Sequence, residues 1–367
     1  MKTKRKLIYV KHYLIYFEKK YCIIHFVDKE SKNMMNKKKV KRFTCLLIFV
    51  CVLCGCHSTE IIKTVEEKEV QEKVQEKVQE EIIVGFSQYV TDWPWMVAQT
   101  NSIVSQAKLK DYKLVWKDAG GSLEQQKDDI EELIELGVSY LLVVPGEEFG
   151  IEGLVRYANQ KGIAVISLGR ELRTVTDNVI CIQSDQRLEG QMAGKWVVEY
   201  LGGSGNVVEI QGNLGSSSAK QRNEGFREVI DQYPDIHVLS ESPADFTRSG
   251  GNDTMVNILR QYSGEVDAVF CHNDEMAIGA IQAIKGVGQV PGKDMAFISV
   301  DGEKDALKAI IAGELSASIK CTPFLGIKVF EVIDMLENGQ KVEKMYILPT
   351  EIVYDEDNAR EYINKAY

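Results

Sequence analysis

Two kinds of segment alternate along the chain from residue 82 to residue 319. Short, continuous apolar runs have the length of buried strands, and longer segments place apolar residues at helical spacing. The predicted strands cover residues 82–86, 113–116, 140–144, 164–167, 207–210, 237–239, 268–270, 295–300 and 317–319. The predicted helices cover residues 96–108, 122–136, 152–160, 188–201, 219–232, 254–262, 276–285 and 305–312. Apolar strands interleaved with helices predict parallel sheets that are covered on both faces.

The number of strands predicts more than one hydrophobic core. About ten strands over some 285 residues exceed what a single core holds comfortably, so the pattern predicts two α/β lobes. The tandem arrangement places the change of lobe near Ser184–Arg187.

A targeting signal precedes this body. Residues 37–42 (Lys-Lys-Lys-Val-Lys-Arg) are basic, and the apolar stretch Phe43–Leu53 that follows is too short to span a membrane comfortably. The stretch ends in Leu53-Cys54-Gly55-Cys56, which resembles the bacterial lipoprotein signal. The resemblance implies cleavage before Cys56 and lipidation of its side chain, so the protein would be extracytoplasmic and anchored to the cell membrane. A plain secretory signal, or a cysteine that stands at this position by chance, is the alternative.

Residues 1–33 mix Lys, Tyr, Ile and His and do not fit a signal peptide. They precede a complete basic region that could begin at Met34 or Met35. Our hypothesis is that translation begins there, so that residues 1–55 comprise an upstream extension and the signal peptide. Residues 56–81 then form a charged tether with a Val-Gln-Glu-Lys repeat. Its period of four drifts around a helix, so the valines form no sustained seam, and we interpret the segment as a partly helical spacer.

Charge and cysteine usage exclude several classes of protein. Of the 44 basic and 54 acidic residues, residues 1–55 hold 14 and 3, which leaves 30 and 51 for the rest of the chain. An acidic body repels phosphate backbones, so nucleic acid is not an expected partner. The body holds Cys181, Cys271 and Cys321, which lack metal-ligand spacing. We predict that they are buried free thiols and that the chain has no metal site.

Sequence motifs of nucleotide binding and catalysis are missing or misplaced in the body. Gly202–Gly205 precedes a predicted strand instead of following one, and Val287 stands where a P-loop ending in Gly292-Lys293 requires glycine. No Gly-x-Ser-x-Gly sequence is found there either. We therefore predict no catalytic residues, no cofactor and no enzymatic activity.

Residues that follow the predicted strands are candidates for ligand binding, because open α/β sheets bind ligands outside the carboxyl ends of their strands. The candidates are Trp93, Trp95, Arg170, Arg222, Phe246, Asn273, Asp274 and Asp301. Arg, Asn and Asp form paired hydrogen bonds with neighbouring hydroxyls, and aromatic rings pack on the apolar face of a sugar. The set favours a sugar ligand. Structural roles remain open: Asn273 or Asp274 as a helix N-cap, Arg170 as a surface ion pair and Trp93 as a core residue.

The same segments resemble those of the periplasmic sugar-binding proteins of the ribose/galactose type, most of all the galactofuranose-binding branch. The blocks that carry the resemblance are residues 207–212, 222–226, 245–249, 272–285 and 299–302, within a similarity that runs from about Ile82 to Tyr354. The resemblance implies the fold of a type I periplasmic binding protein, with two Rossmann-like lobes that have parallel sheets and are joined by a three-stranded hinge. The expected lobes are residues 82–185 with 322–350, and residues 186–321 with 351–367.

The resemblance also implies a role for each candidate residue. It implies a stacking aromatic at Trp95, hydroxyl-binding arginines at Arg170 and Arg222, polar contacts from Asn273 and Asp301, and a second ring contact from Phe246.

Two positions depart from the galactofuranose-binding branch, which has Arg at the position of Met96 and Asp at the position of Gly169. Their absence removes charge-assisted hydrogen bonds worth roughly 1.5–3 kcal/mol each. The expected ligand is therefore a monosaccharide whose identity is open: a furanose, a pentose or a related polyol.

Closure of two lobes around a sugar suits two kinds of partner. The first is the permease of an ABC transporter, to which the protein would deliver its sugar; the alternative is a membrane sensor kinase, for which it would be a receptor subunit. A transcription regulator built on this core would need a helix-turn-helix where this chain has a lipoprotein signal. We expect the protein to be a monomer.

Overall fold

The computed structural model describes residues 6–10, 13–18, 21–26, 81–173, 178–262 and 264–367, which belong to two compact units, Met1–Glu80 and Glu81–Tyr367. In the first unit, β1 (Lys6–Val10), β2 (Tyr13–Glu18) and β3 (Tyr21–Phe26) pair as an antiparallel sheet that we had not predicted. The signal peptide, Cys56 and almost all of the tether lie outside the described residues. Along the described part of the chain, none of the helices has both the length and the apolar character to cross a bilayer.

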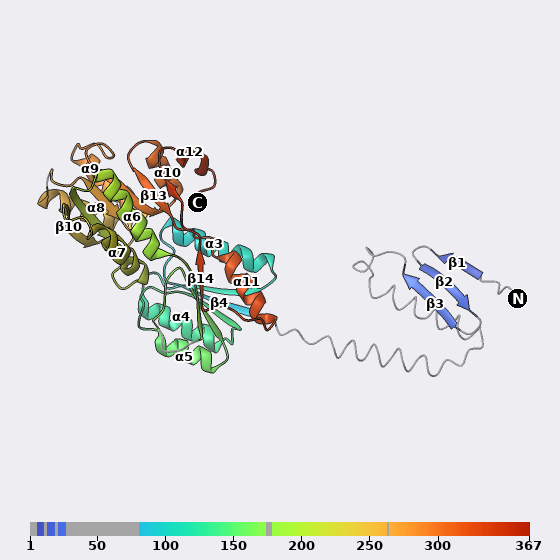
Figure 1. The fold of residues 1–367 in the computed structure, drawn as a ribbon. Helices are drawn as coiled ribbons and strands as arrows, with labels where there is room; N and C mark the ends of the chain where they lie inside the picture. Colours follow the sequence, from blue (N-terminus) through green and yellow to red (C-terminus); the bar gives the residue numbers. More distant parts are fainter. Residues whose placement is uncertain (1–5, 11–12, 19–20, 27–80, 174–177, 263) are drawn as a thin grey trace. The chain divides into compact units, whose positions relative to one another are not determined.

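The second unit contains two six-stranded sheets (Figure 1). The first sheet is parallel throughout, in the order β14-β8-β7-β6-β4-β5. Its strands are β4 (Ile83–Gln88), β5 (Lys113–Asp118), β6 (Tyr140–Val144), β7 (Ala164–Leu168), β8 (Val179–Ser184) and β14 (Met345–Leu348). Its helices are α3 (Pro94–Leu109), α4 (Leu123–Glu135), α5 (Glu152–Gln160) and α11 (Gly326–Glu337). Together they form the first lobe.

The second sheet has the order β10-β9-β11-β12-β13-β15 and forms the second lobe. Its strands are β9 (Gly205–Gln211), β10 (Ile236–Pro243), β11 (Ala268–Cys271), β12 (Ala296–Asp301), β13 (Ala317–Lys320) and β15 (Val353–Tyr354). Its helices are α6 (Gln186–Leu201), α7 (Ser217–Ile230), α8 (Arg248–Gln261), α9 (Asp274–Gly286), α10 (Lys304–Ile311) and α12 (Ala359–Tyr362). The sheet is parallel except for β15, which pairs antiparallel with β13 at the edge.

Three segments carry the chain from one sheet to the other. They lie between β8 and α6, between β13 and α11, and between β14 and β15. This arrangement confirms the predicted two-lobed α/β fold with a three-stranded hinge. It also explains the continuous apolar runs in the sequence: helices cover both faces of each sheet, and Leu141, Leu142, Val143 and Val144 of β6 are all fully buried.

The helices α6 and α7 approach each other so closely that two glycines are required. A Cβ atom at Gly190 would lie 2.0 Å from the carbonyl oxygen of Arg222, and one at Gly225 would lie 2.0 Å from the carbonyl oxygen of Arg187. The two backbones are therefore in direct contact, and this contact sets the position of the turn of α7 that carries Arg222.

Candidate ligand-binding site

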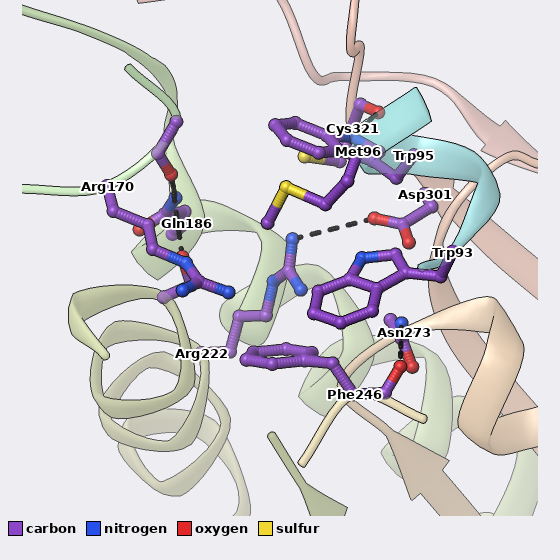
Figure 2. A pocket seen from close by; sticks show the side chains of 12 residues that line it. Trp93, Trp95, Met96, Arg170, Gln186, Arg222, Phe246, Asn273, Asp301 and Cys321 are labelled. Atoms are coloured by element: carbon purple, nitrogen blue, oxygen red, sulfur yellow. Dashed lines mark hydrogen bonds and ion pairs between the residues drawn. The ribbon is translucent and has the colours of Figure 1, made fainter. Parts of the chain in front are cut away.

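A pocket lies where the ends of strands from both lobes meet (Figure 2). The pocket is small, and residues of both lobes line it. The structure brings all six predicted ligand-binding residues to this pocket. The lining residues are Trp93, Trp95, Met96, Gly169, Arg170, Gln186, Ser218, Arg222, Phe246, Asn273, Asp301 and Cys321.

Arg222 is held by buried carboxylates. Its Nε donates to Oε2 of Glu189 at 2.8 Å, its Nη1 donates to the carbonyl oxygen of His272, and its Nη2 lies 3.8 Å from Oδ1 of Asp301. Burial lowers the pKa of Arg222, but the neighbouring carboxylates, Glu189 above all, more than offset this and raise the pKa above its ordinary value. Arg222 is thus a fixed cation with one edge toward the pocket.

Arg170, directly after β7, is equally buried but has other partners. Its Nη1 donates to the carbonyl oxygens of Pro145 and Gly146 at 3.0 and 3.2 Å, and its guanidinium carbon lies 5.3 Å from the centre of the Phe246 ring. No described carboxylate forms an ion pair with it. Burial, together with the nearby charge of Arg222, lowers the pKa of Arg170 to about 10. The structure excludes the surface ion pair that we had left open for Arg170.

Asp301 ends β12 with an unusual backbone conformation, at φ 133°. Such a conformation costs roughly 1–3 kcal/mol and persists only where the surroundings impose it. Here the buried carboxylate of Asp274 accepts hydrogen bonds from the backbone N–H groups of Gly302 at 2.8 Å and Glu303 at 2.7 Å. Burial raises the pKa of Asp274 to about 6 and that of Asp301 well above its ordinary value.

Phe246 also lies in a strained turn, in which Asp245 and Phe246 both have positive φ, at 54° and 62°. Asn273 supports this turn by donating from Nδ2 to the carbonyl oxygen of Phe246 at 3.1 Å. Its Oδ1 accepts from the backbone N–H of Met276 at 3.0 Å, so Asn273, and not Asp274, is the N-cap of α9. Asn273 reaches the pocket, but much of its hydrogen bonding serves the fold.

Two tryptophans of the first lobe line the pocket, and they differ in exposure and in hydrogen bonding. Trp95 is 8% exposed, and its Nε1 donates to the carbonyl oxygen of Cys321 at 3.0 Å. Trp93, just before α3, is half-buried and makes no hydrogen bond as an N-cap. Figure 2 shows the Trp93 indole projecting into the pocket toward Arg222 and Phe246. Trp93, which we had left between core and ligand contact, is therefore a further candidate for stacking.

Sequence reasoning did not single out Gln186, Ser218 or Cys321 as lining residues. Gln186 donates from Nε2 to the carbonyl oxygen of Gly169, and its buried Oε1 has no hydrogen-bond partner among the described residues. Gln186 and Cys321 stand just after the strands β8 and β13. Applying the strand-end rule to these positions would have found both of them.

The three cysteines of the body are free and buried, as predicted. Burial raises the pKa of the Cys271 thiol, which is therefore uncharged at neutral pH. Within the described ranges, no group of three or more His, Cys, Asp or Glu side chains is arranged to hold a metal ion.

Comparison with known proteins places the chain in a family. The family model described as "Periplasmic binding protein domain" matches residues 84–341. The galactofuranose-binding protein YtfQ of Escherichia coli (strain K12) is 32% identical, over 77% of this chain and 91% of that protein. The ribose import binding protein RbsB of Bacillus subtilis (strain 168) is 33% identical, over 74% and 87%. The predicted resemblance to the ribose/galactose type is thus confirmed.

Comparison with solved structures supports the same family. The periplasmic binding protein of an arabinose ABC transporter from Shewanella sp. ANA-3, bound to α- and β-L-arabinofuranose, matches with a TM-score of 0.75 and 32% identity, over 77% of this chain and 95% of that one. The fructose-binding periplasmic domain of a hybrid two-component system matches with a TM-score of 0.72 and 28% identity, over 77% and 94%. These relatives are binding proteins and not enzymes, in agreement with the prediction. The chain belongs to the periplasmic binding protein family.

Proposed function

We propose that this chain is the extracytoplasmic, lipid-anchored binding protein of an ABC importer, and that it captures a monosaccharide between its two lobes. The observation that carries the proposal is the composition of the pocket. Two buried arginines, a carboxyl group and aromatic rings converge there from the strand ends of both lobes. The names of the relatives support a sugar ligand, since they refer to galactofuranose, ribose and arabinofuranose.

Each group has a function toward a sugar. The N–H edges of Arg170 and Arg222 that face the pocket donate to neighbouring hydroxyls, and Asp301 accepts a hydrogen bond from another hydroxyl. Phe246 and the indole of Trp93 or Trp95 pack on the C–H face of the ring.

We expect the two lobes to close around the sugar, because both of them contribute residues to the pocket. Trp95 and Arg170 come from the first lobe, whereas Arg222 and Asp301 come from the second. A ligand that bonds to both sides stabilises the closed arrangement by its differential affinity for that state. The closed protein then presents both lobes to the permease, while lipidated Cys56 and the charged tether hold it near the membrane.

A thermal-shift screen tests the sugar. The purified protein is heated with hexoses, pentoses, furanose sugars, polyols, amino acids and nucleosides, and a true ligand at 100 times its Kd should add about 2.7 kcal/mol of stability. Stabilisation by amino acids or nucleosides and by no carbohydrate would reject the proposal.

A Cys56→Ala variant tests the anchor. We expect the native protein in the membrane fraction with a lipid-modified Cys56 in its N-terminal peptide, and the variant in the soluble extracytoplasmic fraction. Equal partitioning of the two proteins would contradict the proposal of lipid anchoring. Peptides from residues 1–33 in a precursor trapped before cleavage would contradict a start at Met34 or Met35.

The second candidate function is that of a sugar-sensing receptor subunit for a membrane sensor kinase. It is favoured by the similarity to the sugar-binding domain of a two-component system. Deletion of the gene separates the two functions, because the importer component is needed for uptake of the labelled sugar. The receptor subunit is needed only for the transcriptional response.

A further inference from the structure

One wall of the pocket offers no free hydrogen-bonding group to a ligand. It consists of Trp95, Met96 and Cys321, with Gly169 beside them, and Figure 2 shows the first three together on one side of the pocket. Trp95 Nε1 already donates to the carbonyl oxygen of Cys321, and Met96 Sδ already accepts from Nε2 of Gln88 at 3.5 Å. The remaining polar groups of this wall have partners as well.

The Cys321 thiol lies 3.2 Å from Oγ of Ser184, and the carbonyl oxygen of Gly169 accepts from Nε2 of Gln186. Gln88, which binds Met96 from behind, does not line the pocket. A sugar hydroxyl placed against this wall would therefore lose its water without gaining a partner.

The opposite flank has free polar groups. Arg170 uses only Nη1 in hydrogen bonds to the described residues, so its Nε and Nη2 remain free to donate. The Oε1 atom of Gln186 is a buried acceptor without a partner in the same part of the chain, and Gln186 is only 2% exposed. Figure 2 shows both side chains on one flank of the pocket. This flank requires a ligand with hydroxyls that both accept and donate.

We propose that the ligand is a deoxy monosaccharide, whose methyl or methylene group contacts Trp95, Met96 and Cys321 while its hydroxyls bond to Arg170 and Gln186. The inference rests on the proposed sugar-binding function and deepens it.

The test compares matched pairs of sugars that differ by one hydroxyl. Isothermal titration of the full chain measures Kd for D-galactose and D-fucose, L-galactose and L-fucose, L-mannose and L-rhamnose, and D-ribose and 2-deoxy-D-ribose. In the pair that binds, we expect the deoxy sugar to bind about 5- to 150-fold more tightly, the cost of one buried hydroxyl without a partner. Tighter or equal binding of the hydroxylated sugar in every binding pair overturns the inference and leaves the proposed function standing. Binding of no carbohydrate overturns both.

A Met96→Gln substitution tests whether this wall is responsible. Glutamine has nearly the length of methionine but adds a donor and an acceptor, so we expect the preference for the deoxy sugar to shrink or reverse. Val97→Gln is the matched control, because Val97 is the next residue of α3, is 42% exposed and does not line the pocket. It should keep the native preference. An unchanged preference in a folded Met96→Gln protein overturns the assignment to this wall, and the sugar pairs on the native chain decide the question if that variant fails to fold.

Discussion

The two lobes each supply one arginine to the pocket, and they hold it in different ways. Arg222 of the second lobe lies between two carboxylates, with its Nε on Glu189 at 2.8 Å and its Nη2 near Asp301. Among the described residues, Arg170 of the first lobe bonds only to backbone carbonyls, and it faces the ring of Phe246. Both side chains are about equally buried, at 4% and 5% exposure.

The difference shows what each half of the site requires from a ligand. The charge of Arg222 is compensated by carboxylates of the protein itself, so the second lobe needs no ligand group to neutralise this cation. No carboxylate in the described part of the chain compensates the charge of Arg170, and a buried cation without an anion is costly until other acceptors reach it. Hydroxyl oxygens of a sugar are such acceptors. We therefore expect Arg222 to act mainly in stability and position, and Arg170 mainly in affinity.

Replacing Arg222 by Leu should have the largest effect on the free energy of unfolding. It leaves the carboxylate of Glu189, which is fully buried, without its cation, and breaking such a pair costs about 3–5 kcal/mol. Urea denaturation measures the loss. Arg187→Leu is the control, since Arg187 pairs with Glu224 and Glu228 at the surface and its loss should change stability far less. Equal losses in both variants would contradict the compensation of charge inside the second lobe.

A Gly169→Ala substitution should have the next largest effect and tests the first lobe. Gly169 has a φ of +68°, and a Cβ atom there would lie 2.8 Å from Cη2 of Trp95, so we expect a cost of about 2–4 kcal/mol. Gly162→Ala separates backbone strain from the clash, because Gly162 has a φ of +81° but open space around it. Its cost should be about 1–2 kcal/mol. Similar melting curves for the two variants would show that Trp95 moves aside freely.

The pH dependence of stability tests the acidic side of the second lobe. Glu303 is 1% exposed, and burial together with the charges of Asp274 and Asp301 raises its pKa to about 11. The native state therefore keeps a proton that the unfolded state releases above about pH 4.5. This contribution to stability is complete below that pH and is lost progressively as the pH rises toward 11.

Glu303→Gln removes this loss, because glutamine does not titrate. We expect the variant to match the native protein near pH 4.5 and to be more stable than it at pH 8, by an amount that grows with pH, measured by urea denaturation at both values. A difference between the two proteins that stays constant with pH would show that Glu303 is already ionised in the native state.

Arg170→Met should have the smallest effect on stability and a large effect on binding. Removing a buried charge without an anion offsets the loss of two hydrogen bonds to backbone carbonyls, so the free energy of unfolding should change by less than about 1 kcal/mol. Affinity for the sugar should fall about 10- to 100-fold, as measured by titration calorimetry. A strongly destabilised variant would remove the distinction between the two arginines.

The sequence revealed most of the fold because buried parallel strands are apolar throughout. Some elements were missed all the same. We did not predict the strand β8, although five of its six residues are buried, or the helix α11. The strand β14 is an edge strand whose residues are only exposed or half-buried, and β15 contains two residues, too few to show a period. The antiparallel pairing of β15 follows from the third passage of the chain between the lobes and has no local signature.

The site was predictable where chemistry and strand ends coincide, and less so where tertiary contacts decide. Asn273 has a residue type that binds sugars, yet its hydrogen bonds to Met276 and Phe246 come from the fold. The pairing of Arg222 with Glu189 joins two helices and is invisible in a linear sequence. Gln186 acquires its importance only because its Oε1 remains without a partner in the described structure.

The glycine contact between α6 and α7 has a consequence for how this pocket can diversify. Because Gly190 and Gly225 leave no space for a Cβ atom, the turn that carries Arg222 cannot shift without separating the two helices. Adaptation to a new sugar is therefore easier at pocket side chains outside this contact, such as Met96 of the first lobe. The contact between α6 and α7 is fixed by steric constraint, whereas pocket side chains of the first lobe can be exchanged. Engineering of a new sugar specificity should therefore leave α6 and α7 unchanged and vary the first lobe.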